Sequence, residues 1–188
     1  MALLDGIPSN AKEMTNAMEL GDKVFELAQP KLNLTPKAQS VLDLMKEGLS
    51  LGDVLEITEE ERNAMFAQGC KLVQLGDLQK ARALLSQLYL FEPLDARVIY
   101  MLGVIFQLQG DLATAAKIYV QFLALDATNA DGYLRLGECH LAAKENDLAL
   151  GLLRTAKAEC DRGHGTPATR ERAAQLLAHL EQAAAKAS

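Results

Sequence analysis

One spacing constrains this chain more than any other feature: between residues 65 and 153, similar residues recur every 34 positions. Gly69, Gly103 and Gly137 are separated by 34 residues, twice. At an average glycine usage of about 7%, a given glycine recurs at two fixed offsets in about one of 200 trials. Further columns keep the same register: Met65, Ile99, Tyr133; Leu72, Phe106, His140; Ala81, Ala115, Ala149; and Leu85, Tyr119, Leu153. The repetition indicates an array of equivalent units rather than an irregular bundle.

Each period predicts two helices joined by a turn. A glycine in mid-helix costs about 1 kcal/mol relative to alanine, so the glycine column predicts a partner helix that crosses closely there. A 34-residue period with small residues in these columns is that of the tetratricopeptide repeat. We therefore expect an all-α helical-repeat solenoid with three hairpins in residues 58–161, at about 62–95, 96–129 and 130–163.

The segments on either side of the repeats differ from them. Thr35 followed by Pro36 predicts the start of a helix that ends at Gly48. Residues 35–57 are expected to form an N-terminal helical segment, whose apolar face is made of Val41, Leu42, Leu44 and Met45. Residues 1–34 form an extension that is expected to be partly helical or disordered. Residues 166–188 predict a helix that caps the array and ends in a frayed tail.

The first helix of each hairpin is expected to line the inner, concave face of the array. Its residues one step beyond the core columns are then candidates for a peptide-binding groove: Asn63, Phe66, Cys70, Val73, Arg97, Tyr100, Val104, Gln107, Leu134, Glu138 and Leu141, together with Asp131. Most are apolar, and a concave apolar surface favours a protein partner. Asn63, Arg97 and Gln107 could hydrogen-bond the backbone of a bound strand. Alternatively, the N-terminal segment or a second subunit covers this surface.

Composition excludes several other functions. The net charge of −6 and the pI near 5.1 disfavour nucleic-acid binding. No apolar run approaches the roughly 20 residues that cross a bilayer, which disfavours a membrane protein. Three cysteines, an odd number, predict reduced cytosolic thiols. We expect no catalytic residue, no metal site and no cofactor, because no phosphate loop, nucleophile motif or metal-spaced cluster occurs.

Several stretches make the chain resemble the class II chaperones of type III secretion, the translocator chaperones of the LcrH/SycD/IpgC type. The first is residues 46–55, with the pattern Gly-x-x-Leu-x-x-Val before the repeats. Others are Phe66 and Cys70, where the family keeps aromatics, and the Gly-Glu-Cys-His-Leu stretch at 137–141. Leu102 and Gly103, followed by Gln107 and Gly110, also match. The resemblance covers about residues 38–182.

Membership implies a bacterial cytoplasmic chaperone that binds an N-terminal segment of each of two hydrophobic translocator proteins in its concave groove and keeps them secretion-competent. It also implies a virulence role, a homodimer formed through the N-terminal helix and, in some members, an interaction with a transcription regulator. The alternative is a general repeat adaptor or scaffold for assembly of a bacterial envelope or secretion complex. The genes beside this one distinguish the two.

Overall fold

A computed structural model of the protein describes residues 35–187, and helices make up all of the regular secondary structure in this range. The predicted extension 1–34 lies outside the described residues. The chain divides into two compact units, to which the described residues contribute 35–58 and 59–187. Among the described helices, none combines the length and the apolar character needed to span a membrane.

In the first unit, two helices begin at capped residues. Helix α2 is Pro36–Lys46, and the Thr35 side chain accepts a hydrogen bond from the Ala38 amide at its start. Helix α3 is Leu51–Val54, where Ser50 and Asp53 form a reciprocal capping box. Gly48 has a φ of +98°, a left-handed conformation that ends the preceding helix as predicted.

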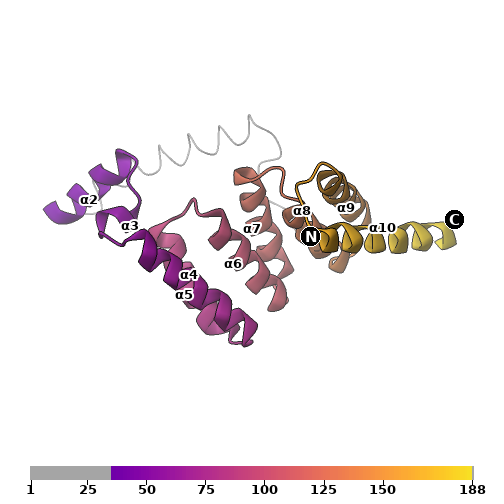
Figure 1. Cartoon of the computed structure of the whole chain (residues 1–188), viewed down its shortest axis with the longest axis horizontal. Helices are drawn as coiled ribbons and strands as arrows, with labels where there is room; N and C mark the ends of the chain where they lie inside the picture. The colour runs from indigo at the N-terminus through magenta and orange to yellow at the C-terminus, as the bar shows by residue number, and fades with distance from the viewer. Residues whose placement is uncertain (1–34, 188) are drawn as a thin grey trace. The chain divides into compact units, whose positions relative to one another are not determined.

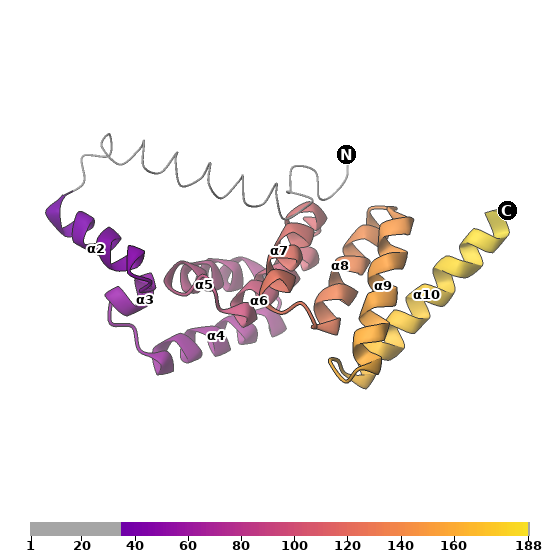
Figure 2. The same cartoon turned by 90° about the horizontal axis from the view of Figure 1, so that it is seen from above.

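The second unit contains three helical hairpins and one final helix (Figures 1 and 2). The hairpins are α4 (Glu59–Gln74) with α5 (Leu78–Phe91), α6 (Ala96–Leu108) with α7 (Leu112–Leu125), and α8 (Ala130–Ala142) with α9 (Asn146–Asp161). The final helix α10 is Pro167–Ala187, so the tail predicted to fray is helical to Ala187. Asp95 and Asn129, which are one period apart, cap α6 and α8: Asp95 accepts from the Arg97 amide and Asn129 from the Gly132 amide.

The turns inside the hairpins repeat one backbone conformation. Gly76 and Gly110 have φ values of +77° and +80°, and Lys144, in the equivalent position, has a φ of +64°. The left-handed region is open to glycine but costs other residues roughly 1 kcal/mol or more. Lys144 therefore keeps the turn of the third hairpin at an energetic cost that the two glycines avoid.

The glycine column lies where the two helices of each hairpin touch. A Cβ atom built on Gly69 would lie 2.5 Å from Leu85 Cδ2, and one on Gly103 would lie 2.7 Å from Tyr119 Cε1. The same contact in the third hairpin is between Gly137 and Leu153, at 3.1 Å. The prediction that these glycines make space for a crossing helix is confirmed.

The core of the second unit is divided into clusters along the array. One cluster joins α5 and α6 through Leu85, Leu88 and Ile105, which are at most 1% exposed. A second joins α6, α7 and α8 around Tyr119 of α7, which is fully buried. The third joins α8, α9 and α10. Each hairpin thus buries its apolar surface against the next, as a repeat array requires.

Candidate peptide-binding groove

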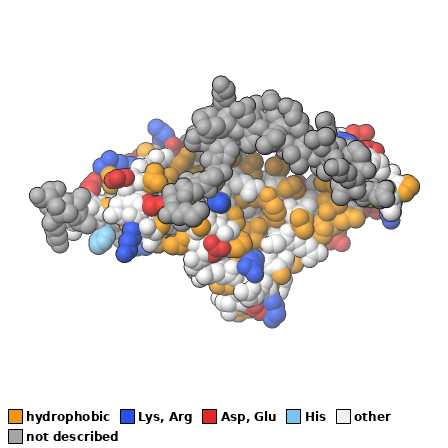
Figure 3. Space-filling model, turned by 180° about the vertical axis from the view of Figure 1, so that it is seen from behind, with side chains coloured by type: hydrophobic (Ala, Val, Ile, Leu, Met, Phe, Trp, Pro, Cys, Tyr) orange, Lys and Arg blue, Asp and Glu red, His pale blue; other side chains and the backbone are white. Residues whose placement is uncertain are grey.

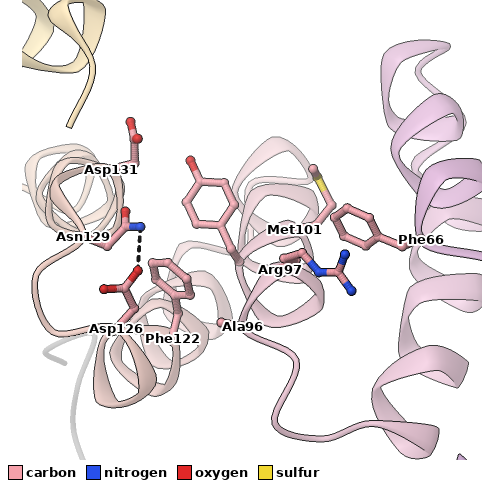
Figure 4. Close-up of a pocket in the computed structure, with 9 residues that line it drawn as sticks. Phe66, Ala96, Arg97, Met101, Phe122, Asp126, Asn129 and Asp131 are labelled. Carbon is pink, nitrogen blue, oxygen red and sulfur yellow. Dashed lines mark hydrogen bonds between the residues drawn. The ribbon is translucent and has the colours of Figure 1, made fainter. Parts of the chain in front are cut away.

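A hollow of about 380 Å³ opens on the side of α4, α6 and α8 within the second unit. Figure 4 shows Phe66 beside Arg97 at one end, Phe122 near the middle, and Asp126, Asn129 and Asp131 at the other end. Nine residues line it: Phe66, Ala96, Arg97, Tyr100, Met101, Phe122, Asp126, Asn129 and Asp131. The walls are therefore largely apolar and aromatic, with carboxylates gathered at one end.

The aromatic wall is held rigidly by packing. The Tyr100 ring lies 5.1 Å from the Phe122 ring and 5.9 Å from the Tyr119 ring, centroid to centroid, in tilted arrangements. Such tilted pairs stabilise by about 0.5–1.5 kcal/mol beyond their buried area. Tyr119 is buried behind this wall, where burial raises the pKa of its hydroxyl, and this hydroxyl donates to Gln107 Oε1 at 2.8 Å. The wall therefore presents a preformed apolar surface.

Arg97 is fixed at the other end of the hollow. Its Nε and Nη2 donate to the two carboxylate oxygens of Asp95 at 3.0 and 2.7 Å, and its Nη1 donates to Asn63 Oδ1 at 3.0 Å. Its guanidinium lies 5.1 Å from the centre of the Phe66 ring. Burial alone would raise the pKa of Asp95, but the hydrogen bonds and charge of Arg97 lower it below its usual value. The positive charge of Arg97 is thus balanced within the protein.

The structure gathers only part of the predicted groove around this hollow. Phe66, Arg97, Tyr100 and Asp131 line it. Val73 and Val104 instead pack as half-buried residues against core clusters. The remaining predicted residues that do not line it are Asn63, Cys70, Gln107, Leu134, Glu138 and Leu141.

The third hairpin differs most from the expectation, because α10 covers its inner face. Leu134, predicted to face the groove, is 6% exposed and packs with Leu177 and Leu180 of α10, which corrects its assignment. Leu141 packs against the same cluster. The groove surface that remains open on this side is therefore shorter than the predicted stripe.

The polar groove candidates are also engaged with neighbours. Gln107 accepts from Tyr119 and donates from Nε2 to Glu138 Oε2 at 3.3 Å. Glu138 further accepts from Arg172 Nε at 3.0 Å and pairs with Arg135 at 3.5 Å. These contacts join α6, α8 and α10, so Gln107 and Glu138 connect the hairpins instead of presenting their polar groups to a bound strand.

Residues that the sequence pattern did not single out complete the hollow. Met101 and Ala96 come from α6, Asp126 and Asn129 from the α7–α8 turn, and Phe122 from the second helix α7. Only first helices were expected to line the groove, so Phe122 was missed. A usable signal exists, because the equivalents of Phe122 one period away are Leu88 and Ala156, both smaller.

Other apolar side chains lie on the surface away from the hollow. Leu75, Leu90 and Leu94 are 71%, 64% and 73% exposed and are not among the residues that line the hollow. In the view from behind, hydrophobic side chains gather on part of the surface that the described residues form (Figure 3). Exposure alone therefore does not mark the groove, and its concave, rigid aromatic wall is the distinguishing feature.

Comparison with known proteins identifies the repeat. Two family models, each described as tetratricopeptide repeat, match residues 66–130 and 106–160. Comparison with curated protein sequences gives no match.

Solved structures share the fold over most of this chain. A type III secretion system complex from Aeromonas hydrophila superposes with a TM-score of 0.69 at 17% identity, covering 77% of this chain and 96% of that one. PcrH, a Pseudomonas aeruginosa protein, in complex with the chaperone binding region of PopD gives 0.62 at 25% identity, covering 70% and 97%. The Yersinia enterocolitica chaperone SycD, with a peptide of the translocator YopD, gives 0.62 at 20%, covering 68% and 97%. The chain is a tetratricopeptide-repeat protein with the fold of the type III secretion translocator chaperones.

Proposed function

We propose that this protein is a chaperone of a type III secretion system that binds an extended segment near the N-terminus of a hydrophobic translocator. The observation that most supports this proposal is the hollow with aromatic walls, in a fold shared with PcrH and SycD. Its apolar lining includes Phe66, Tyr100, Met101 and Phe122. An extended segment offers alternate side chains to such a surface, which gives both affinity and specificity. We propose that two translocators share this site and that binding occurs in the bacterial cytoplasm.

In the proposed mechanism, the protein covers apolar surface of the translocator and catalyses no reaction. A translocator with long apolar runs aggregates in water unless part of that surface is covered. The hollow binds one apolar stretch reversibly, with a dissociation constant expected between micromolar and nanomolar, or about 8–12 kcal/mol. Release then requires the secretion machinery or a competing ligand, because neither a cofactor nor a catalytic group is part of this mechanism. The transcription regulator implied by the resemblance stays a prediction.

Co-expression with a translocator encoded beside this gene tests the proposal. Phe66→Asp places a charge in the hollow and is expected to abolish co-purification of the translocator. Leu90→Asp, at a side chain that is 64% exposed and outside the hollow, is the matched control and should retain it. Circular dichroism establishes that both variants are folded. Undiminished capture by folded Phe66→Asp protein would refute the assignment of the groove.

We also propose that α2 forms a homodimer through Val41, Leu42, Leu44 and Met45. Support comes from the exposure of its apolar side chains, since Leu44 and Met45 are 39% and 40% exposed. A paired helix would remove this apolar surface from water. Light scattering should give twice the monomer mass for the wild type and the monomer mass for Leu44→Asp with Met45→Asp. A monomeric wild type at micromolar concentration would contradict this.

A further inference from the structure

Among the residues that line the hollow, negative charges outnumber positive ones. The guanidinium of Arg97 is paired with Asp95, so these two residues contribute no net charge. Asp126 and Asp131 remain, and neither forms an ion pair within the described part of the chain. Their hydrogen-bond donors are neutral: Asn129 Nδ2 and Thr128 Oγ1 donate to Asp126 at 2.9 and 3.2 Å, and Thr169 Oγ1 donates to Asp131 at 2.6 Å.

These two carboxylates share one end of the hollow with the aromatic wall. Figure 4 shows Asp126 and Asp131 on the same side of the hollow, next to Phe122 and away from Phe66 and Arg97. A ligand that fills the hollow therefore contacts aromatic rings along most of its length and two negative charges at the end beside α8. The chain as a whole also carries a net charge of −6.

We propose that the segment bound in this hollow carries a lysine or arginine next to its apolar anchor, and that Asp126 and Asp131 select it. This rests on the proposed function, since it names a property of the segment that the groove binds. A long basic side chain suits both parts of the site. Its methylene stem packs on the rings of Tyr100 and Phe122 while its charged end reaches the carboxylates.

A basic side chain explains the two carboxylates better than a metal ion does. Metal sites gather three or more ligand side chains, and the described residues contain no such group of His, Cys, Asp or Glu. Arg97 does not supply a positive charge to Asp126 and Asp131, because its guanidinium nitrogens already donate to Asp95 and Asn63. In this proposal the positive charge beside Asp126 and Asp131 therefore comes from the ligand.

A set of labelled peptides tests this selectivity. The probes are fluorescein-labelled decapeptides that carry Leu or Phe at every second position. At the positions between them, Lys, Gln or Glu is placed at one position after another, which gives matched sets that differ only in that residue. Anisotropy gives the dissociation constants. Because exposed ion pairs contribute about 0.2–1 kcal/mol each, the best Lys peptide should bind about fivefold more tightly than its Gln counterpart at low salt. This preference should shrink as the salt concentration rises.

Isosteric variants connect the preference to the two residues. Asp126→Asn with Asp131→Asn keeps an oxygen acceptor for Asn129 and Thr169, so the fold is expected to survive. The double variant should lose the Lys preference and bind the Gln peptides as the wild type does. Glu171→Gln removes one negative charge from an exposed residue outside the hollow and should keep the preference.

The outcomes separate this inference from the proposed function. Equal binding of Lys, Gln and Glu peptides, with loss of all binding in Phe66→Asp, would overturn the selectivity and leave the chaperone groove in place. A Lys preference that persists in the double variant would also overturn the assignment to Asp126 and Asp131. Failure of every peptide to bind the wild type would refute the groove as a peptide site, and the selectivity with it.

Discussion

Replacing Gly103 by alanine sets two effects of opposite sign against each other. In the middle of α6, alanine gains about 1 kcal/mol of helix propensity. Its Cβ, however, would lie 2.7 Å from Tyr119 Cε1 and 3.0 Å from Cδ1 and Cζ. The Tyr119 ring is fully buried, and its hydroxyl donates to Gln107, so the ring cannot retreat without losing that bond. Overpacking of this kind costs about 1–3 kcal/mol. We expect a net loss of about 1 kcal/mol in the free energy of unfolding.

Two further glycines give unfolding free energies with which the loss at Gly103 can be compared. Gly151 lies within α9, and a Cβ there meets no atom within 4 Å, so Gly151→Ala should stabilise by about 1 kcal/mol. Gly137→Ala meets the flexible Leu153 side chain at 3.1 Å and should fall between the two. Urea denaturation followed by circular dichroism at 222 nm gives the midpoints. A Gly103→Ala variant as stable as Gly151→Ala would refute the claim that this column exists for close helix crossing.

Three more perturbations follow from particular contacts. Lys144→Gly removes a left-handed non-glycine residue and should raise the unfolding free energy by about 1 kcal/mol, measured by the same denaturation; an unchanged midpoint would contradict the backbone argument. The hydrogen bond from His164 holds the pKa of Glu159 below its usual range, so its stabilisation is present above about pH 4.5 and lost as the pH falls through the lower folded value. The difference in melting temperature between wild type and Glu159→Gln should therefore vanish at low pH, and a constant difference would count against this. Truncation after residue 165 uncovers Leu134 and should increase binding of a hydrophobic dye, whereas unchanged fluorescence would contradict the covering role of α10.

The repeat could be predicted well because its signals are local and periodic. The three hairpins lie within the predicted region 58–161, from Glu59 at the start of α4 to Asp161 at the end of α9, and Asp95 and Asn129 cap the helices that follow them. Caps, turns and the glycine column each depend on a few neighbouring residues and on one recurring helix crossing. Such features are consistent with one another along the array, so a single register predicts all of them.

The inner surface could not be predicted as completely, because it depends on what the final helix does. Arg172 of α10 contacts Glu138 from 34 residues away, the same separation as between Arg97 and Asn63. Helix α10 thus continues the pattern as the first helix of a fourth, incomplete unit, and it buries Leu134. The columns of the repeat do not continue into α10, where Pro167 and Glu171 stand one period after Tyr133 and Gly137. Phe122 was missed because only the first helices were expected to line the groove, although it is larger than Leu88 and Ala156 one period away.

Site-specific photo-crosslinking tests the central claim most directly. A photoreactive phenylalanine analogue replaces Met101, which lines the hollow, or Leu148, which is 51% exposed and outside it. Each variant is co-expressed with the neighbouring translocator and irradiated, and the cross-linked peptide is located by mass spectrometry. We expect a cross-link from position 101 to an N-terminal translocator segment and none from position 148. Cross-linking from position 148 without any from position 101 would contradict binding in the hollow.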